Sequence, residues 1–368
     1  MRAASGAARG VKNAHWAHTS PPPARYFGVP TAPATLPHTS MRVSRLLLAA
    51  AFLLPLAPAP GAQTAGRLYD QAEIGELLYG VRQDLVDVPE VEWRAWVLDH
   101  ETGNPIFARA ELYKWAGDGD VVTGRERLAM VQFMNRVYLN DLAVGDTLIV
   151  PSRLGLDPRA YAPFPRRYEG AAGFDKLFVI HKGVQAWAAY EDGDLERWGL
   201  VNTGAADSPT PAGRFNFNWK ELDRVSTLSP PGERWRMRWV FNFHHARGIH
   251  VHQYRMPNGE PASHGCVRLI TDDAKWIYDW ADGWRTSAGN AATGLPSADG
   301  RVIEQGTTVL VLGDGEEPVG GPPARFVWDG DQPRLRVVDL PADPYTVPPG
   351  TPQQELFDRR RAQAAANS

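Results

Sequence analysis

Residues 249–252 read Ile-His-Val-His, and residues 263–268 read Ser-His-Gly-Cys-Val-Arg. Cys266 is the only cysteine in 368 residues, and five of the ten histidines lie in or just before this part of the chain: His244, His245, His250, His252 and His264. A free thiol has a pKa of about 8.5, so it needs a neighbouring base to act as a nucleophile at neutral pH. An imidazole can accept that proton. We therefore predict that Cys266 is a catalytic nucleophile; the alternative is a buried cysteine that packs as a small apolar side chain.

The overall composition is that of a globular protein. The length predicts about two domains at roughly 100–200 residues each. The net charge of −3 gives no overall basic field, so we expect no nucleic-acid partner. The chain has 13 tryptophans, a high number. Most are expected in the core, and the alternative for a few of them is stacking on sugar faces.

The N-terminal residues predict an exported protein. Residues 1–40 are rich in Ala, Pro, Ser and Arg without apolar periodicity, which predicts a disordered or mis-assigned leader. Residues 41–62 combine a basic start, the apolar run Leu46–Leu56 and small residues, the three parts of a signal peptide. The run is too short to span a membrane. We therefore expect a protein of the periplasm or cell wall that is not membrane-spanning after signal removal.

Export bears on the cysteine. Cysteines outside the cytosol usually occur as disulfide pairs. A single unpaired thiol in an exported chain is therefore a candidate for reactivity or for an intermolecular bond.

Residues 66–151 predict a small N-terminal α/β domain. Helical spacing predicts a helix over residues 69–87, and the pattern Thr123–Glu126 predicts the start of another. The closing run Leu142–Pro151 resembles the end of a LysM module, which implies cell-wall binding; any helix–turn–strand unit would give the same pattern. Residues 152–172, rich in Pro and Arg in their second half, predict a linker.

From residue 173 the chain consists of short apolar runs separated by turn residues. The runs Lys176–Ile180 and Val184–Tyr190 are the first of them, and regular spacing of such strands favours an antiparallel sandwich or barrel. Helical spacing after Thr271 predicts one helix. Residues 314–368 predict a Pro-rich tail, with one added strand and an extended or disordered end.

The spacing of His250 and Cys266 resembles the signature of L,D-transpeptidases with a YkuD-type catalytic domain. In that family a histidine is followed, after a dozen or more residues, by Ser/Thr-His-Gly-Cys, an apolar residue and Arg or Asn. Other similar segments occur in the same order: Gln185 after the opening strand, Asn202–Gly204 with Thr210–Gly213, and Gly306–Val309. The resemblance covers about residues 173–313. It implies a mainly β (α+β) fold, an antiparallel β-sandwich with a flanking helix.

The resemblance also implies an activity in peptidoglycan maturation. The donor is a tetrapeptide stem, cut between the L-centre of its third residue and the terminal D-Ala, and the acceptor is an amine of another stem. No cofactor or metal is implied, and we expect a monomer. The alternatives are an L,D-carboxypeptidase or cross-link hydrolase that uses water, a zinc-dependent peptidase built on the histidines, and an inactive wall-binding module.

The resemblance and the chemistry together assign catalytic roles. Cys266 would form a thioester, with His250 as the general base. The family orients this imidazole through a main-chain carbonyl, for which Val251 is the matching residue. Main-chain N–H groups around Gly265 and Cys266 would stabilise the oxyanion.

The neighbouring residues are expected to bind substrate. Arg268 would pair with a substrate carboxylate through its bidentate fork, or else form a framework salt bridge. His264 would share a face with the thiol on an extended chain, as a supporting residue or as the base itself. Ser263 is expected to support the site by hydrogen bonding and His252 to line the cleft. His244 and His245 have no place in the motif.

Overall fold

The structure is a computed structural model that describes residues 71–367 apart from 257–259, 288–300, 315–325 and 331. The expected leader and signal peptide lie outside the described residues. None of the helices in the described ranges has the length and apolar character needed to cross a membrane. The helices are α1 Gln71–Leu78, α2 Pro105–Ala116, α3 Val121–Asn135, α4 Thr271–Trp280 and α6 Pro352–Ala366.

The strands, in chain order, are β1 Trp93–Val97, β2 Thr147–Pro151, β3 Lys176–His181, β4 Ala186–Glu191, β5 Asp194–Leu200, β6 Gly213–Asn216, β7 Lys220–Val225, β8 Arg236–His244, β9 Ile249–Gln253, β10 Val267–Leu269, β11 Arg285–Thr286, β12 Val302–Glu304, β13 Thr308–Leu312, β14 Phe326–Asp329 and β15 Gln332–Leu335. Single 3-10 turns occur at Leu85–Asp87, Leu139–Asp141, Pro158–Tyr161, Glu169–Ala171 and Pro344–Thr346.

Two sheets pack together within residues 176–312. One has the order β5-β4-β3-β13-β6 and the other the order β10-β9-β8-β7. Most pairs are antiparallel, but β13 runs parallel to β3 and β10 parallel to β9. Buried side chains of both sheets and of α4 share one core, which includes Phe178, Trp187, Phe217, Phe241, Val251, Val267 and Ile277. The mainly β fold with a flanking helix is confirmed.

Strand β3 explains why the run at residues 176–181 is almost continuously apolar. Its alternate side chains point to opposite faces of the sheet. Phe178 and Ile180 enter the core between the two sheets, whereas Leu177 and Val179 enter a second core on the other face. The second core also contains Ile74 of α1 and Phe133 of α3. A strand covered on both faces needs apolar residues at successive positions.

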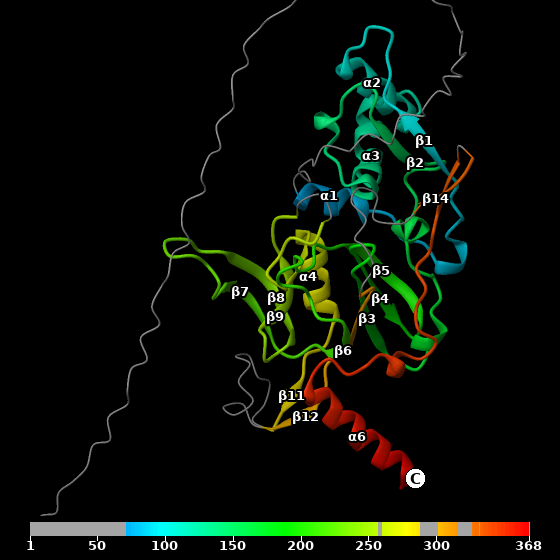
Figure 1. Ribbon diagram of the computed structural model, residues 1–368. Coiled ribbons are helices and arrows are strands. Elements are labelled where there is room, and N and C mark those ends of the chain that lie inside the picture. The colour runs from blue at the N-terminus through cyan, green and yellow to red at the C-terminus, as the bar shows by residue number, and fades with distance from the viewer. Residues whose placement is uncertain (1–70, 257–259, 288–300, 315–325, 331, 368) are drawn as a thin grey trace, which may run out of the picture. The chain divides into compact units, whose positions relative to one another are not determined.

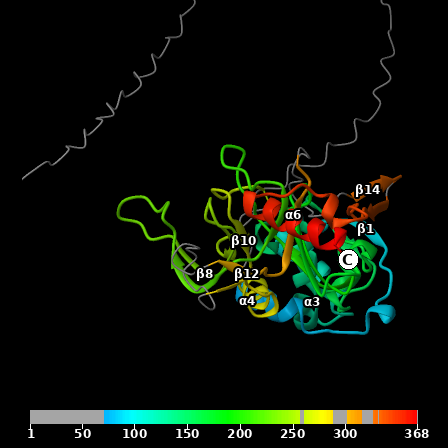
Figure 2. The same ribbon diagram turned by 90° about the horizontal axis from the view of Figure 1, so that it is seen from below.

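The β7–β8 hairpin extends away from the rest of its sheet (Figures 1 and 2). Its strands pair antiparallel over residues 220–225 and 236–241. Leu222 and Leu228 are exposed on it. The hairpin therefore stands beside the sandwich with little core of its own.

Residues 93–151 form a small module with its own core. Strands β1 and β2 pair antiparallel, and α2 and α3 pack with them around buried side chains such as Leu112, Leu128 and Leu148. Helix α3 begins earlier than the Thr123 pattern predicts, because the side chain of Asp120 caps it by accepting a hydrogen bond from Thr123 N.

Helix α1 is shorter than predicted and packs against α4. It ends at Leu78, before Gly80. A Cβ on its Gly75 would lie 2.3 Å from the Cβ of Asp272, so the two helices approach each other there as only glycine allows. Predicting a helix as far as residue 87 was wrong.

The predicted linker is packed rather than loose. Tyr161 and Phe164 are buried in the second core. Asp157 and Arg159 form a buried ion pair with 2.8 Å between Oδ2 and Nη2. Residues 152–172 thus connect the small module to the sandwich through a fixed structure.

The predicted disordered end is also wrong. Residues 352–366 form α6, which begins after Thr351, whose Oγ1 accepts a hydrogen bond from Gln354 N. Asp358 of α6 forms an ion pair with Arg214 of β6. Farther upstream, the strand predicted over Arg334–Leu340 coincides with β15 only at Arg334 and Leu335, where β15 forms a hairpin with β14. Capping and a buried partner for Asp358 stabilise a helix that composition alone did not reveal.

Candidate active site

Cys266 and His250 face each other at the end of the sheet β10-β9-β8-β7. Cys266 Sγ lies 3.6 Å from His250 Nδ1 and 3.9 Å from Gly248 O. A sulfur–nitrogen distance of this size allows the thiol to donate its hydrogen to the ring. The structure thus brings together the two residues that the sequence predicts as nucleophile and base.

His250 is held by a strand. It lies on β9, which pairs with β8 on one side and β10 on the other. Asn242 on β8 adds a side-chain hydrogen bond to Ile249 O at 3.1 Å. The ring of Trp219 packs edge-to-face against His250, with centroids 5.2 Å apart. Backbone pairing and one aromatic contact therefore fix the imidazole.

His250 is neutral in this environment. Burial, reinforced by His252 and Arg224, lowers the pKa of His250 to about 3. Burial also raises the pKa of the Cys266 thiol above its ordinary value, against the opposing influence of His250 and Arg268. The resting pair is a thiol and a neutral imidazole rather than an ion pair, and the imidazole is free to accept a proton.

The carbonyl of Val251 does not orient His250, contrary to the prediction. His250 Nε2 is buried and has no hydrogen-bond partner among the described residues. Val251 lies opposite Phe241 in one ladder and Val267 in the other. Its main chain belongs to the middle of the sheet, so packing against Trp219 takes the place of the expected hydrogen bond.

Cys266 is held by a loop. Gly265 has φ of +106°, a conformation that favours glycine. The Ser263 hydroxyl accepts a hydrogen bond from Gly265 N at 3.1 Å and donates one to Cys266 O at 2.5 Å. Thr210 Oγ1 donates to Gly265 O at 2.8 Å. Side chains thus fix both peptide groups next to the nucleophile.

This geometry excludes one of the main-chain N–H groups that were predicted to stabilise the oxyanion. The N–H of Gly265 is occupied by Ser263, so it is not available as the sequence suggested. The main-chain N–H groups of His264 and Cys266 donate to no residue within the described ranges. They are the free donors closest in sequence to the thiol.

A further group of residues supports the loop from behind. Gln185 bonds Thr203 twice, through Nε2 to Oγ1 at 2.8 Å and through Oε1 to Thr203 N at 2.9 Å. Thr203 O in turn accepts hydrogen bonds from Ala262 N and Ser263 N. The sequence had marked Gln185 and Thr203 only as parts of a resemblance, because their partners lie far away in the chain.

Cys266 opens into a cavity of about 180 Å³. Arg268 lines it, with its guanidinium 4.9 Å from the ring centre of Tyr254. Among the described residues, no carboxylate pairs with the Arg268 guanidinium or acts on its pKa, which leaves its charge available to the cavity. The predicted framework salt bridge is therefore not seen.

None of the other described histidines hydrogen-bonds the thiol, although His252 and His264 line the same cavity. His252 lines the cavity, is bonded to Gln253 O at 3.0 Å, and has its pKa lowered by burial to about 4. His264 is exposed and stacks on Trp235, with centroids 5.4 Å apart. His244 packs against Phe215. Within the described ranges no three metal-ligating side chains converge on one point.

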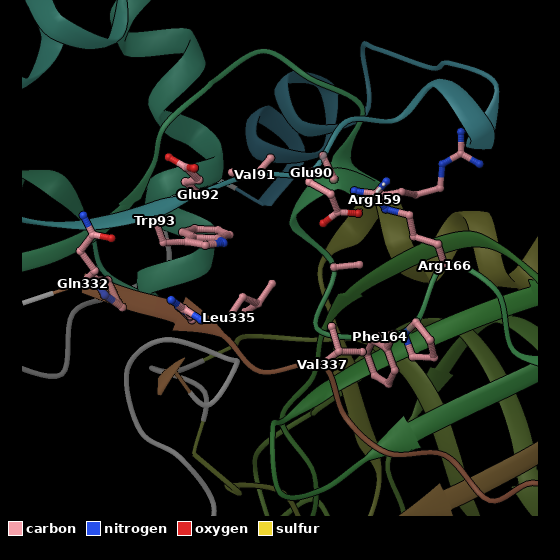
Figure 3. Close-up of a pocket in the computed structure, with 15 residues that line it drawn as sticks. Glu90, Val91, Glu92, Trp93, Arg159, Phe164, Arg166, Gln332, Leu335 and Val337 are labelled. Atoms are coloured by element: carbon pink, nitrogen blue, oxygen red, sulfur yellow. Dashed lines mark ion pairs between the residues drawn. The ribbon is translucent and has the colours of Figure 1, made fainter. Parts of the chain in front are cut away.

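A larger cavity, of about 550 Å³, lies away from the nucleophile (Figure 3). Trp93, Phe164 and Leu335 line it. Its buried Arg159 is paired with Asp157, and Arg166 donates to the carbonyls of Val88 and Pro89. The cavity carries no thiol or imidazole and its arginines are already bonded, so size alone does not mark the reactive site.

Residues 175–311, which include both His250 and Cys266, match the family model described as YkuD, L,D-transpeptidase catalytic domain. This confirms the resemblance that the sequence motif indicated. No curated protein matches the chain.

Several solved structures are similar. An L,D-transpeptidase from Mycobacterium smegmatis is 21% identical with a TM-score of 0.28, over 37% of this chain and 58% of that one. L,D-transpeptidase 1 from Mycobacterium tuberculosis is 20% identical with a TM-score of 0.27, over 38% and 62%. An L,D-transpeptidase from Stackebrandtia nassauensis is 17% identical with a TM-score of 0.30, over 68% and 97%. The chain thus spans less than two thirds of the first two.

Proposed function

We propose that the protein is a peptidoglycan L,D-transpeptidase that uses Cys266 as its nucleophile and acts in the periplasm or cell wall after export. The observation that carries the proposal is the 3.6 Å approach of the only thiol to a buried, neutral imidazole. The pair lies at a cavity within a YkuD domain. This combination supplies both the nucleophile and the base for acyl transfer.

The reaction would proceed in two proton-balanced halves. His250 Nδ1 accepts the Cys266 proton as sulfur attacks the carbonyl that precedes the terminal D-Ala, and the free N–H groups of His264 and Cys266 receive the oxyanion. The protonated imidazole then gives its proton to the departing amine, leaving a thioester. In the second half the same nitrogen takes a proton from the acceptor amine, which attacks the thioester and releases Cys266.

Arg268 would bind the donor. It lines the cavity with its charge unpaired by described carboxylates, so a carboxylate of the stem peptide is a suitable partner. Replacing it with lysine removes the bidentate fork but keeps the charge. We expect Arg268→Lys to raise KM more than it lowers kcat.

The small N-terminal module would bind the wall. Its α3 is followed by strand β2, as the LysM resemblance implies. Half-buried Trp96 and Trp115 lie with ring centroids 5.0 Å apart, and Arg94 lies over both. Such rings can stack on sugar faces. Loss of binding to insoluble peptidoglycan in Trp96→Ala and Trp115→Ala, with catalysis of soluble stems unchanged, would support this role; unchanged binding would contradict it.

The deciding experiment is incubation with purified disaccharide-tetrapeptide, followed by mass analysis of the products. Cross-linked dimers, or stems with an exchanged terminal D-amino acid, are expected. Stems that are only shortened would identify an L,D-carboxypeptidase, and cleavage of existing dimers a cross-link hydrolase. A chelator is expected to leave activity intact and a thiol alkylator to abolish it; the opposite pattern would mean a zinc-dependent peptidase.

A further inference from the structure

A continuous set of buried hydrogen bonds runs from the small module to the nucleophile. It begins at Arg136, the residue that caps the C-terminus of α3 with φ of +52°. The Arg136 side chain is 1% exposed and its Nη2 donates to Val184 O at 2.7 Å and Gln185 O at 2.9 Å. One guanidinium thus holds two successive carbonyls of the turn between β3 and β4.

That turn is conformationally demanding. Gln185 has φ of +48°, which is uncommon for a residue other than glycine. Such a conformation persists when the surroundings fix it. Gln185 O accepts both from Arg136 and from Val201 N at 2.9 Å, so Arg136 is one of the contacts that hold the turn in place.

The Gln185 side chain connects this turn to the loop that carries Cys266. Its amide makes the two hydrogen bonds to Thr203, and Thr203 O holds the N–H groups of Ala262 and Ser263. Ser263 then holds Gly265 N and Cys266 O. Gln185, Thr203 and Ser263 are 0%, 1% and 4% exposed. A buried polar group that loses its partner costs about 1–3 kcal/mol, so water does not replace any of these links freely.

The contact beside Thr203 is equally close. A Cβ on Gly204 would lie 2.9 Å from the Cα of Gly265, so the two glycines pack directly against each other. Gly204 N also donates to Thr210 Oγ1 at 2.9 Å, the same hydroxyl that bonds Gly265 O. Movement of residues 203–204 is therefore transmitted to the loop that carries the thiol.

We propose that Arg136 is a positioning residue for Cys266: by fixing the Val184–Gln185 turn it aligns the nucleophile loop with His250. The proposal rests on Cys266 being the nucleophile. It gives the small module a part in catalysis that is separate from wall binding, because the residue that caps the C-terminus of its α3 sets the geometry of the reacting pair.

The test compares three variants at a temperature well below their unfolding midpoints. Arg136→Met removes both hydrogen bonds, and Arg136→Lys keeps the charge and one donor. Arg166→Met is the matched control, because Arg166 also donates to two successive carbonyls, those of Val88 and Pro89, but at the cavity of Figure 3. Thermal unfolding of each variant separates loss of stability from loss of alignment.

Two rates are measured on each protein. One is acylation by a carbapenem, which needs an aligned pair, and the other is alkylation of the single thiol by iodoacetamide, which needs only exposure and ionisation. For Arg136→Met we expect acylation to fall about tenfold or more. Alkylation at pH 7 should rise, because a displaced loop exposes the thiol and relieves the burial that raises its pKa. Arg136→Lys should be intermediate, and Arg166→Met should change neither rate.

A double variant examines the path itself. Gln185→Met should lower acylation as Arg136→Met does, and the two together should cost little more than either alone, because they interrupt one path. Equal acylation in wild type and Arg136→Met, or fully additive losses, would overturn the proposal. If the wild type reacts with neither carbapenem nor stem peptide, the proposed function fails; alkylation that is the same in Arg136→Met and wild type would then overturn the positioning role independently.

Discussion

The two reacting residues are held by different kinds of structure. His250 lies on β9, whose main chain is paired on both sides, and its ring packs on Trp219. Cys266 lies in a loop whose shape depends on the hydroxyls of Ser263 and Thr210. A residue on a paired strand is held by many backbone hydrogen bonds, whereas a loop fixed by single side chains can be displaced by one substitution. The nucleophile's position should therefore be the more sensitive of the two.

Removing the thiol should have the largest effect. Cys266→Ala is expected to abolish turnover of tetrapeptide stems, and Cys266→Ser to reduce it to background, since a hydroxyl beside the same base is a much weaker nucleophile. Unfolding curves should stay close to wild type because Cys266 is only half-buried. Product formation by both variants at the wild-type rate would refute the assignment.

Loss of the base should follow. His250→Ala is expected to lower kcat about 10²–10⁴-fold, the usual contribution of a general base. His252→Ala should cost far less, because His252 lines the cavity without contacting the thiol. If the order of the two effects were reversed, the base would have to be moved to His252.

A milder pair of substitutions addresses the strand and the loop directly. Ser263→Ala leaves Gly265 N and Cys266 O without their partner and should slow acylation about tenfold at unchanged carbapenem binding. Asn242→Ala removes a bond to the strand before His250. It should lower the unfolding temperature but change acylation less than about threefold, since the ladders remain. Equal losses of acylation would remove the distinction between strand and loop.

A change of pH between 5 and 8 should have the smallest effect on the acylation rate. Because burial lowers the pKa of His250 to about 3, the imidazole is in its proton-accepting form throughout the range from pH 5 to 8. The acylation rate at saturating carbapenem should therefore be nearly constant there, with no decline around the ordinary histidine pKa of about 6.5. A tenfold decline between pH 7 and pH 5 would show that His250 protonates far more easily.

Stability should respond to acid instead. Both His250 and His252 have a lower pKa when folded than when unfolded, so the unfolded chain binds more protons between about pH 4 and pH 6.5. Their contribution to stability is complete above pH 6.5 and declines as the pH falls. Urea unfolding should show this decline, and it should be smaller in His252→Ala.

The sequence predicts the reacting residues of the site better than it predicts the residues that hold them in place. The His250–Cys266 spacing and the Ser-His-Gly-Cys motif are local patterns, and they led to the YkuD domain that the family model matches at residues 175–311. Arg136 was not found, because its role depends on contacts with a turn 48 residues away. Composition likewise gave no sign of α6, whose partner Arg214 is distant in sequence.

The Val251 prediction failed for a related reason. The motif gives the order of residues but not which edge of the strand each carbonyl faces, and β9 became an inner strand with both edges paired. The sequence also gave no sign of how the predicted linker is packed, because Pro and Arg are frequent in loops generally, whereas here Asp157 and Arg159 neutralise each other in the interior. Both outcomes depend on contacts between residues that a local sequence pattern does not reveal.

The most direct measurement is a peptide map of the protein after brief incubation with tetrapeptide stem and no added acceptor. The account predicts one acyl group, of the stem without its terminal D-Ala, on the peptide that contains Cys266, and none in Cys266→Ala. An acyl group on another residue, or continued release of D-Ala by Cys266→Ala, would contradict it.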